Sequence, residues 1–156
     1  MKLRLLTLSL ISALVALPIL SAQEAAPKKM APKEDKTPLG DQMEKLNGAY
    51  RKLGRQVADA TKNEDSLAQV AIIKAAAEAA VKLEPAKKSE VPAAEQAKFV
   101  ADYQAKMKEF LATVGKLETA LKAGDNTAAA ALVEEMKNER NADHKSFKKE
   151  EKKKQG

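Results

Sequence analysis

The chain has 156 residues, no cysteine and a formal net charge of +6, and aromatic residues are scarce. A chain of this length forms one domain with one core. The absence of cysteine excludes disulfide bonds, thiolate metal sites and any haem attached through thioether bonds. Alanine, lysine, glutamate and leucine dominate the sequence and favour helices over sheets, because these side chains lose little entropy in a helix.

Residues 1–22 have the pattern of a secretory signal peptide. Lys2 and Arg4 precede a mostly apolar run from Leu5 to Leu20, and Ala22 provides a small residue at the expected cleavage point. A transmembrane anchor is the alternative, but the apolar run is short and a polar segment follows it. We therefore expect export to a bacterial periplasm, with cleavage after about Ala22.

Residues 23–37 combine prolines and charges with almost no large apolar side chain, which is typical of a disordered linker. The first helix is predicted from about Pro38 to Lys62. Asn63-Glu64-Asp65 predicts a turn and a cap for the second helix, which would end near Leu83, before Pro85. Apolar residues with helical spacing form the inner face of the first helix: Met43, Leu46, Tyr50, Leu53, Val57 and Ala60.

A loop from Pro85 to Pro92 precedes the third helix, which is predicted to end near Ala123. Gly124-Asp125-Asn126 predicts a stop and then a cap for the fourth helix. Residues 148–156 form a polar, mostly cationic tail. The predicted inner faces are Val100, Tyr103, Met107, Phe110, Val114, Leu117 and Leu121 on the third helix, and Ala129, Val133, Met136, Arg140, His144 and Phe147 on the fourth.

Four amphipathic helices joined by short loops predict an all-α fold, an up-down-up-down antiparallel four-helix bundle over residues 38–147. In that topology the turn near Asn63 and the turn near Gly124 lie at the same end. Met43 and His144 each lie about 20 residues from those turns, which is roughly 30 Å at 1.5 Å per residue. A thioether and an imidazole would therefore face each other at the opposite end of the bundle.

Haem iron takes two axial ligands, and a Met/His pair gives a six-coordinate site. Phe99 and Tyr103 at the start of the third helix would supply flat apolar walls, and Arg140 or Lys148 a cation for a propionate. Each residue also has an ordinary structural explanation. Methionine often fills a core, a histidine near a helix C-terminus favours the helix dipole, and an arginine on an apolar stripe often lies at its rim.

Two segments carry a family resemblance. The segment from Leu39 to Asn47 (LGDQMEKLN) is similar to the opening of the soluble cytochrome b562 family, and the segment from Arg140 to His144 (RNADH) is similar to its closing motif. The resemblance spans about Leu39 to Phe147 and is strong only at the two ends. It implies a four-helix bundle that binds one non-covalent haem b, with Met43 and His144 as axial ligands.

The resemblance also implies roles for Phe99 and Tyr103 at the haem wall and for Arg140 at the haem edge. A different register of the third helix, aligned through Val114-Gly115, would put Phe110 at the wall instead. The chain departs from the family pattern at Asp143, which replaces an aromatic residue. The related cytochrome c′ family is excluded, because no cysteine is available to tether its haem.

We therefore expect a periplasmic electron-transfer protein with unknown redox donor and acceptor. An enzyme is not expected, because the ligated iron has no open position and the sole histidine is already a ligand. The alternative is a haem-free helical bundle acting as an envelope scaffold or chaperone-like binder. No nucleic-acid partner is expected, a monomer is expected, and the lysine-rich tail would give at most weak contact with an anionic membrane or partner.

Overall fold

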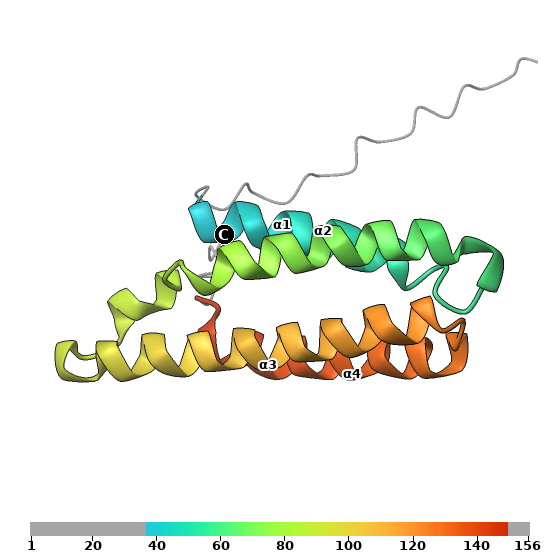
Figure 1. Ribbon diagram of the computed structural model, residues 1–156. Coiled ribbons are helices and arrows are strands. Elements are labelled where there is room, and N and C mark those ends of the chain that lie inside the picture. The colour runs from blue at the N-terminus through green and yellow to red at the C-terminus, as the bar shows by residue number, and fades with distance from the viewer. Residues whose placement is uncertain (1–36, 150–156) are drawn as a thin grey trace, which may run out of the picture. The chain divides into compact units, whose positions relative to one another are not determined.

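The computed structural model describes residues 37–149, and all of them belong to one compact unit. No strand is present in this range, and the four helices form the predicted up-down-up-down bundle (Figure 1). The predicted signal peptide, the linker up to residue 36 and the tail from residue 150 lie outside the described residues. The elements are α1 Pro38–Leu53, η1 Ala60–Lys62, α2 Asn63–Val81, η2 Ala86–Glu90, η3 Ala93–Glu95, α3 Gln96–Lys122 and α4 Asn126–Phe147.

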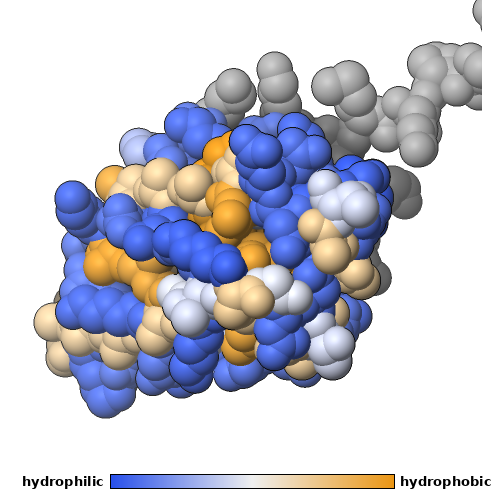
Figure 2. All heavy atoms as spheres, turned by 45° about the vertical axis from the view of Figure 1, so that its right-hand side comes forward, coloured by the Kyte–Doolittle hydropathy of each residue, from blue (hydrophilic) through white to orange (hydrophobic). Residues whose placement is uncertain are grey.

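The predicted apolar stripes converge on a single core. Leu53, Ile73, Val114 and Leu117 are completely buried, and each contributes about 1.5–3 kcal/mol of apolar transfer free energy. In the view of Figure 2, hydrophobic surface appears in separate areas between hydrophilic side chains. No described helix has the length and apolar character needed to cross a membrane.

The first helix is shorter than predicted. α1 ends at Leu53, and residues 54–58 continue as hydrogen-bonded turns in which the Val57 N–H donates to the Leu53 carbonyl at 2.9 Å. Gly54 weakens the helix at this point, and the Asp59 carboxylate starts η1 by accepting from the Thr61 N–H. Val57 still reaches the core with 5% exposure, but the predicted inward position of Ala60 is wrong, because Ala60 begins η1 and is exposed.

The two predicted turns do lie at the same end of the bundle, called here the turn end, at the right of Figure 1. The Asn126 side-chain amide donates to the Val57 carbonyl at 2.6 Å and to Asn63 Oδ1 at 2.7 Å. The Asn63 amide donates in return to Asn126 Oδ1 at 3.3 Å. These contacts of Asn63 and Asn126, the asparagine pair, join the α1–α2 hairpin to the α3–α4 hairpin.

The expected helix stop and cap before α4 are confirmed. Gly124 adopts a positive φ of 73°, which glycine tolerates without steric cost, and the Asp125 carboxylate accepts from the Ala128 N–H at 2.9 Å. The expected capping role of Asn63 is wrong. Asn63 is the first residue of α2, the helix has no side-chain cap, and the Asn63 side chain bonds Asn126 instead.

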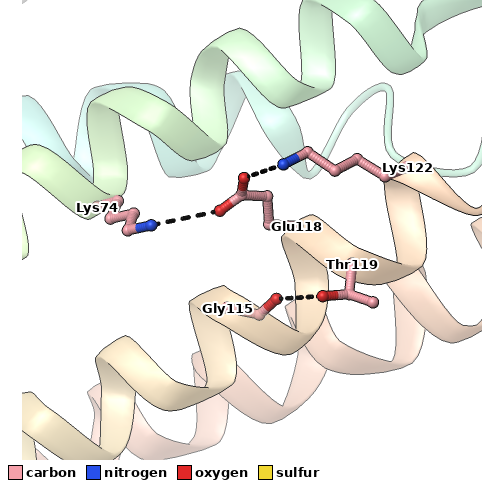
Figure 3. A network of polar contacts seen from close by, with 5 residues as sticks. All are labelled: Lys74, Gly115, Glu118, Thr119 and Lys122. Atoms are coloured by element: carbon pink, nitrogen blue, oxygen red, sulfur yellow. Dashed lines mark hydrogen bonds and ion pairs between the residues drawn. The ribbon is translucent and has the colours of Figure 1, made fainter.

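The outer faces of α2 and α3 are joined by an ion-pair network. Figure 3 shows the Glu118 carboxylate between Lys74 of α2 and Lys122 of its own helix. The Lys74–Glu118 distance is 3.5 Å, and the lysines are largely exposed. Such exposed pairs add at most about 1 kcal/mol each, so they support the packing of the bundle only slightly.

Candidate functional site

The interface between α1 and α4 differs from the other three interfaces between neighbouring helices of the bundle. Close backbone approach is extensive between α1 and α2, α2 and α3, and α3 and α4, but sparse between α1 and α4. Long side chains span the gap: the Tyr50 hydroxyl donates to the Val133 carbonyl at 2.9 Å, and Arg140 reaches Asn47. The two helices that carry the predicted ligands are thus held apart by side chains.

Arg140 lies across this α1–α4 interface rather than at the outer edge of the bundle. Its guanidinium is 5.3 Å from the centre of the Tyr50 ring, a cation–π distance. It donates to Asn47 Oδ1 at 3.4 Å and to Asn141 Oδ1 at 3.5 Å, while its Nε is buried without a partner among the described residues. Burial raises the pKa of the Tyr50 hydroxyl, and the Arg140 charge partly offsets this increase.

The contact between Arg140 and Asn47 sets the relative height of the two predicted ligands. Met43 lies four residues before Asn47 in α1, and His144 lies four residues after Arg140 in the antiparallel α4. Met43 is therefore about 6 Å along α1 from Asn47, and His144 is about 6 Å along α4 from Arg140, both in the direction away from the turn end. We call this opposite end, where residues 82–95 connect α2 to α3, the loop end.

The two side chains differ in burial. Met43 is partly buried and packs against the core, whereas His144 is exposed. The expected inward orientation of His144 is wrong, because the neighbouring Asp143, rather than His144, is the partly buried residue between Arg140 and Phe147. Residues 136, 140, 143 and 147 follow a 4-3-4 spacing, and His144 is about 100° further round the helix than Asp143.

Phe99 and Tyr103, the predicted wall residues, come together at the loop end. The Phe147 ring lies 5.3 Å from Phe99 and 5.5 Å from Tyr103, measured between ring centres. The Tyr103 hydroxyl donates to the Ala80 carbonyl at 3.1 Å, and burial raises its pKa to about 12. Phe110, the wall residue in the other register, lies two turns deeper in α3 and is part of the core.

Phe147 and Tyr50 were not among the predicted site residues. Both lie on the apolar stripes of their helices, so periodicity places them inside the bundle. Periodicity does not show which partners they meet. Phe147 of α4 contacts the two wall aromatics of α3, and Tyr50 of α1 contacts Arg140 of α4. Both contacts depend on which helices are neighbours of α4.

Two carboxylates on α4 are affected by burial. Burial raises the pKa of Asp143, with Lys106 and His144 acting in the opposite direction. Burial also raises the pKa of Glu139, whose Oε1 accepts from the Thr113 hydroxyl at 3.0 Å and whose Oε2 is buried without a partner among the described residues. An acidic side chain thus lies beside His144, at the position where the family pattern has an aromatic residue.

The connection between α2 and α3 covers part of the loop end. η2 packs on α3 and α4, and the Lys87 ammonium donates to the Lys145 carbonyl at 3.1 Å in the last turn of α4. Lys149 pairs with Glu90 at 3.3 Å. Lys148, the other predicted propionate partner, is exposed at the end of α4. Cations thus gather around the C-terminal end of the helix that carries His144.

Among the described residues, the loop end contains both predicted ligands but no cluster of chelating side chains. Between residues 37 and 149, no three histidine, cysteine or acidic side chains lie close enough together to hold a metal ion. Met43 of α1 and His144 of α4 lie at the loop end together with three aromatic rings, and of the two predicted ligands only Met43 is partly buried.

Comparison with known proteins gives one result. A family model described as cytochrome b562 matches residues 38–148, which cover almost all of the described chain. No curated protein and no solved structure matches the chain. The match begins at the first residue of α1 and ends one residue beyond α4, so it includes both predicted ligands.

Proposed function

This chain belongs to the cytochrome b562 family of haem-binding, electron-transfer helical bundles, and on that basis we propose that it carries single electrons on one non-covalent haem b ligated by Met43 and His144. The observation that carries the proposal is the contact between Arg140 and Asn47. It supports a common height for the two ligands on α1 and α4, the pair of neighbouring helices without close backbone packing.

Other residues at the loop end have proposed roles in holding the haem. Phe99, Tyr103 and Phe147 supply apolar surface for the porphyrin, which favours burial of a flat apolar ring. Arg140 supplies positive charge, and its buried Nε is a donor that a propionate oxygen would satisfy. Lys148 is a second cation for the same purpose.

When bound, the haem supplies a one-electron ferric/ferrous couple. The protein contributes a thioether that favours the ferrous state and an imidazole that holds the iron in either state. Two protein ligands leave no coordination position for a substrate, so we propose electron transfer rather than catalysis. With no cysteine in the chain, the haem is held without a covalent bond and acid acetone should extract it.

We also propose that the protein works in the periplasm. The proposal depends on the charged start and apolar run of residues 1–22. The redox donor and acceptor would then be other envelope proteins.

One feature favours the alternative of a haem-free bundle. Phe147 already packs on Phe99 and Tyr103, and His144 faces solvent, so the loop end is closed by the chain's own side chains. A scaffold or chaperone-like binder would need nothing more than this fold. The two functions differ in a simple property, because a haem protein purified from the periplasm is coloured and a scaffold is not.

Ligand substitutions test the proposed function. Met43→Leu keeps the apolar volume and removes the sulfur, so the haem should stay bound through His144, with a high-spin iron and a lower reduction potential. His144→Gln should remove most of the haem affinity, because imidazole is the stronger donor, while the fold is kept since the side chain is exposed.

Met107→Leu is the matched control, because Met107 is a core methionine with 8% exposure, one turn below Tyr103. It should leave the haem spectrum and the potential unchanged. If Met43→Leu keeps a low-spin iron with an unchanged potential, Met43 is not a ligand. If Met107→Leu instead produces the high-spin spectrum, Met107 holds that position.

A further inference from the structure

A groove of about 580 Å³ runs along the outer side of the α1–α2 hairpin, away from the proposed haem site. Gly48 and Ala49 line it from α1, and Gln69 and Ile72 from α2. Ile72 is 45% exposed and is the only large hydrophobic residue that is exposed within residues 37–149. The groove is therefore the place where apolar surface is left uncovered on this hairpin.

Charged residues on α1 flank the groove in a definite order. Asp41 and Glu44 line the groove on the N-terminal side of Gly48, Lys52 lines it on the C-terminal side, and Arg55 lies beyond the end of α1 in the turns that follow. Asp41, Glu44, Gly48 and Lys52 follow a 3-4-4 spacing, so they share one face of α1, and Arg55 follows three residues later in the turns. All four charged side chains are exposed.

This order of charges is complementary to itself. When two such helices run antiparallel and cross at Gly48, Asp41 of each copy faces Arg55 of the other, and Glu44 faces Lys52. A two-fold axis repeats both contacts, so the surface makes four opposite-charge pairs with a second copy. Lys45 departs from the pattern, because it lies on the acidic side and approaches Lys52 of the second copy.

We propose that the α1–α2 groove is a pairing surface for a second copy of this chain, with α1 antiparallel to α1 across Gly48. A Cβ added at Gly48 would meet nothing within 4 Å, so the absence of a side chain leaves open space that lets two backbones approach. The exposed Ile72 side chains then share the apolar surface beside the axis. A dimer differs from the expected monomer, for which the sequence offers no decisive reason.

Pairing in this way leaves the proposed haem site accessible. Met43 is five residues from Gly48, or about 140° round the helix, so the pairing face and the ligand face of α1 point in different directions. The groove is small and the charge pairs are exposed. We therefore expect a weak dimer whose dissociation constant rises with salt, and whose formation does not require haem.

Sedimentation equilibrium of the purified protein without haem, from about 10 μM to 1 mM and at low and high salt, tests the proposal. The parent should dimerise at low salt, with a dissociation constant at least tenfold higher in 1 M salt. Gly48→Glu should weaken the dimer at least tenfold. Gly115→Glu is the matched control, because a Cβ at this α3 glycine also meets nothing within 4 Å, and it should leave the dimer unchanged.

Charge variants identify the orientation. Glu44→Lys should weaken the dimer, and Lys52→Glu added to the same chain should restore it, because each chain contributes both members of the pair. Lys45→Glu should strengthen the dimer. A parent that stays monomeric at 1 mM leaves the groove to solvent or another protein and overturns the proposal. Equal effects of Gly48→Glu and Gly115→Glu, or no restoration by the double variant, overturn it too.

Discussion

Asn126→Ala removes the residue of the asparagine pair that takes part in all three of its hydrogen bonds. The substitution deletes donors to the Val57 carbonyl and Asn63 Oδ1 and the acceptor for the Asn63 amide. These contacts join the two hairpins at the turn end, so their loss affects the packing of one hairpin on the other. The first turn of α4 keeps its cap, because the Asp125 carboxylate still accepts from Ala128.

The expected cost follows from the burial of these groups. A typical intramolecular hydrogen bond contributes about 1 kcal/mol net, and three are lost. Asn63 and Asn126 are only partly buried, so water will replace some of the lost contacts. We therefore expect a loss of about 2 kcal/mol. At about 4 °C per kcal/mol for a domain of this size, the midpoint of thermal unfolding should fall by roughly 8 °C.

Thermal and urea unfolding followed by circular dichroism measure this cost. Asn141→Ala is the control, because Asn141 is exposed and makes only a 3.5 Å contact with Arg140; it should change stability by less than about 0.5 kcal/mol. If Asn126→Ala unfolds at the parental midpoint, the asparagine pair does not hold the hairpins together. Haem should restore part of the lost stability by binding the native state.

Three further variants test a partly buried carboxylate, the N-terminal segment and the basic tail. Burial raises the pKa of Glu139, so ionisation of this side chain destabilises the native state once the pH exceeds the usual glutamate pKa. Glu139→Gln should therefore have a higher melting midpoint than the parent at pH 7 and the same midpoint near pH 4. A lower midpoint than the parent at pH 7 would contradict this. Deletion of residues 23–36 should leave the melting midpoint unchanged; a large decrease would mean that they pack on the bundle. Replacing the lysines from Lys148 to Lys154 with glutamine should keep the haem spectrum, apart from a small effect of Lys148, and weaken binding to anionic vesicles at low salt; unchanged binding would exclude a role for these charges.

The sequence was sufficient to predict the bundle because its core obeys a simple periodicity. Most residues with the predicted 3-4 spacing are buried or partly buried, apart from the exposed Ala60 and His144, and Gly124 and Asp125 act as the local stop and cap that they suggest. These features depend on neighbours within one or two helical turns. Local sequence therefore determines them without knowledge of the tertiary contacts.

The predictions that were wrong or missing concern features that local sequence does not determine. Asn63 is a good cap by type, but Asn126 from the other hairpin bonds its side chain. Val57 continues the apolar stripe, which concealed the end of α1 at Leu53. His144 and Asp143 are adjacent, and periodicity with a tolerance of one residue permits either to face inward. The contacts of Arg140 with Tyr50 and Asn47 depend on the spacing between α1 and α4, which no local pattern reveals.

Titration of the haem-free protein with haemin, followed by visible absorption and then by reduction with dithionite, tests whether Met43 and His144 hold a haem. The proposed Met43/His144 site predicts saturation at one haem per chain and the sharp bands of a low-spin ferrous haem. A protein that stays colourless, or that binds haemin without saturation and with a high-spin spectrum, would contradict it.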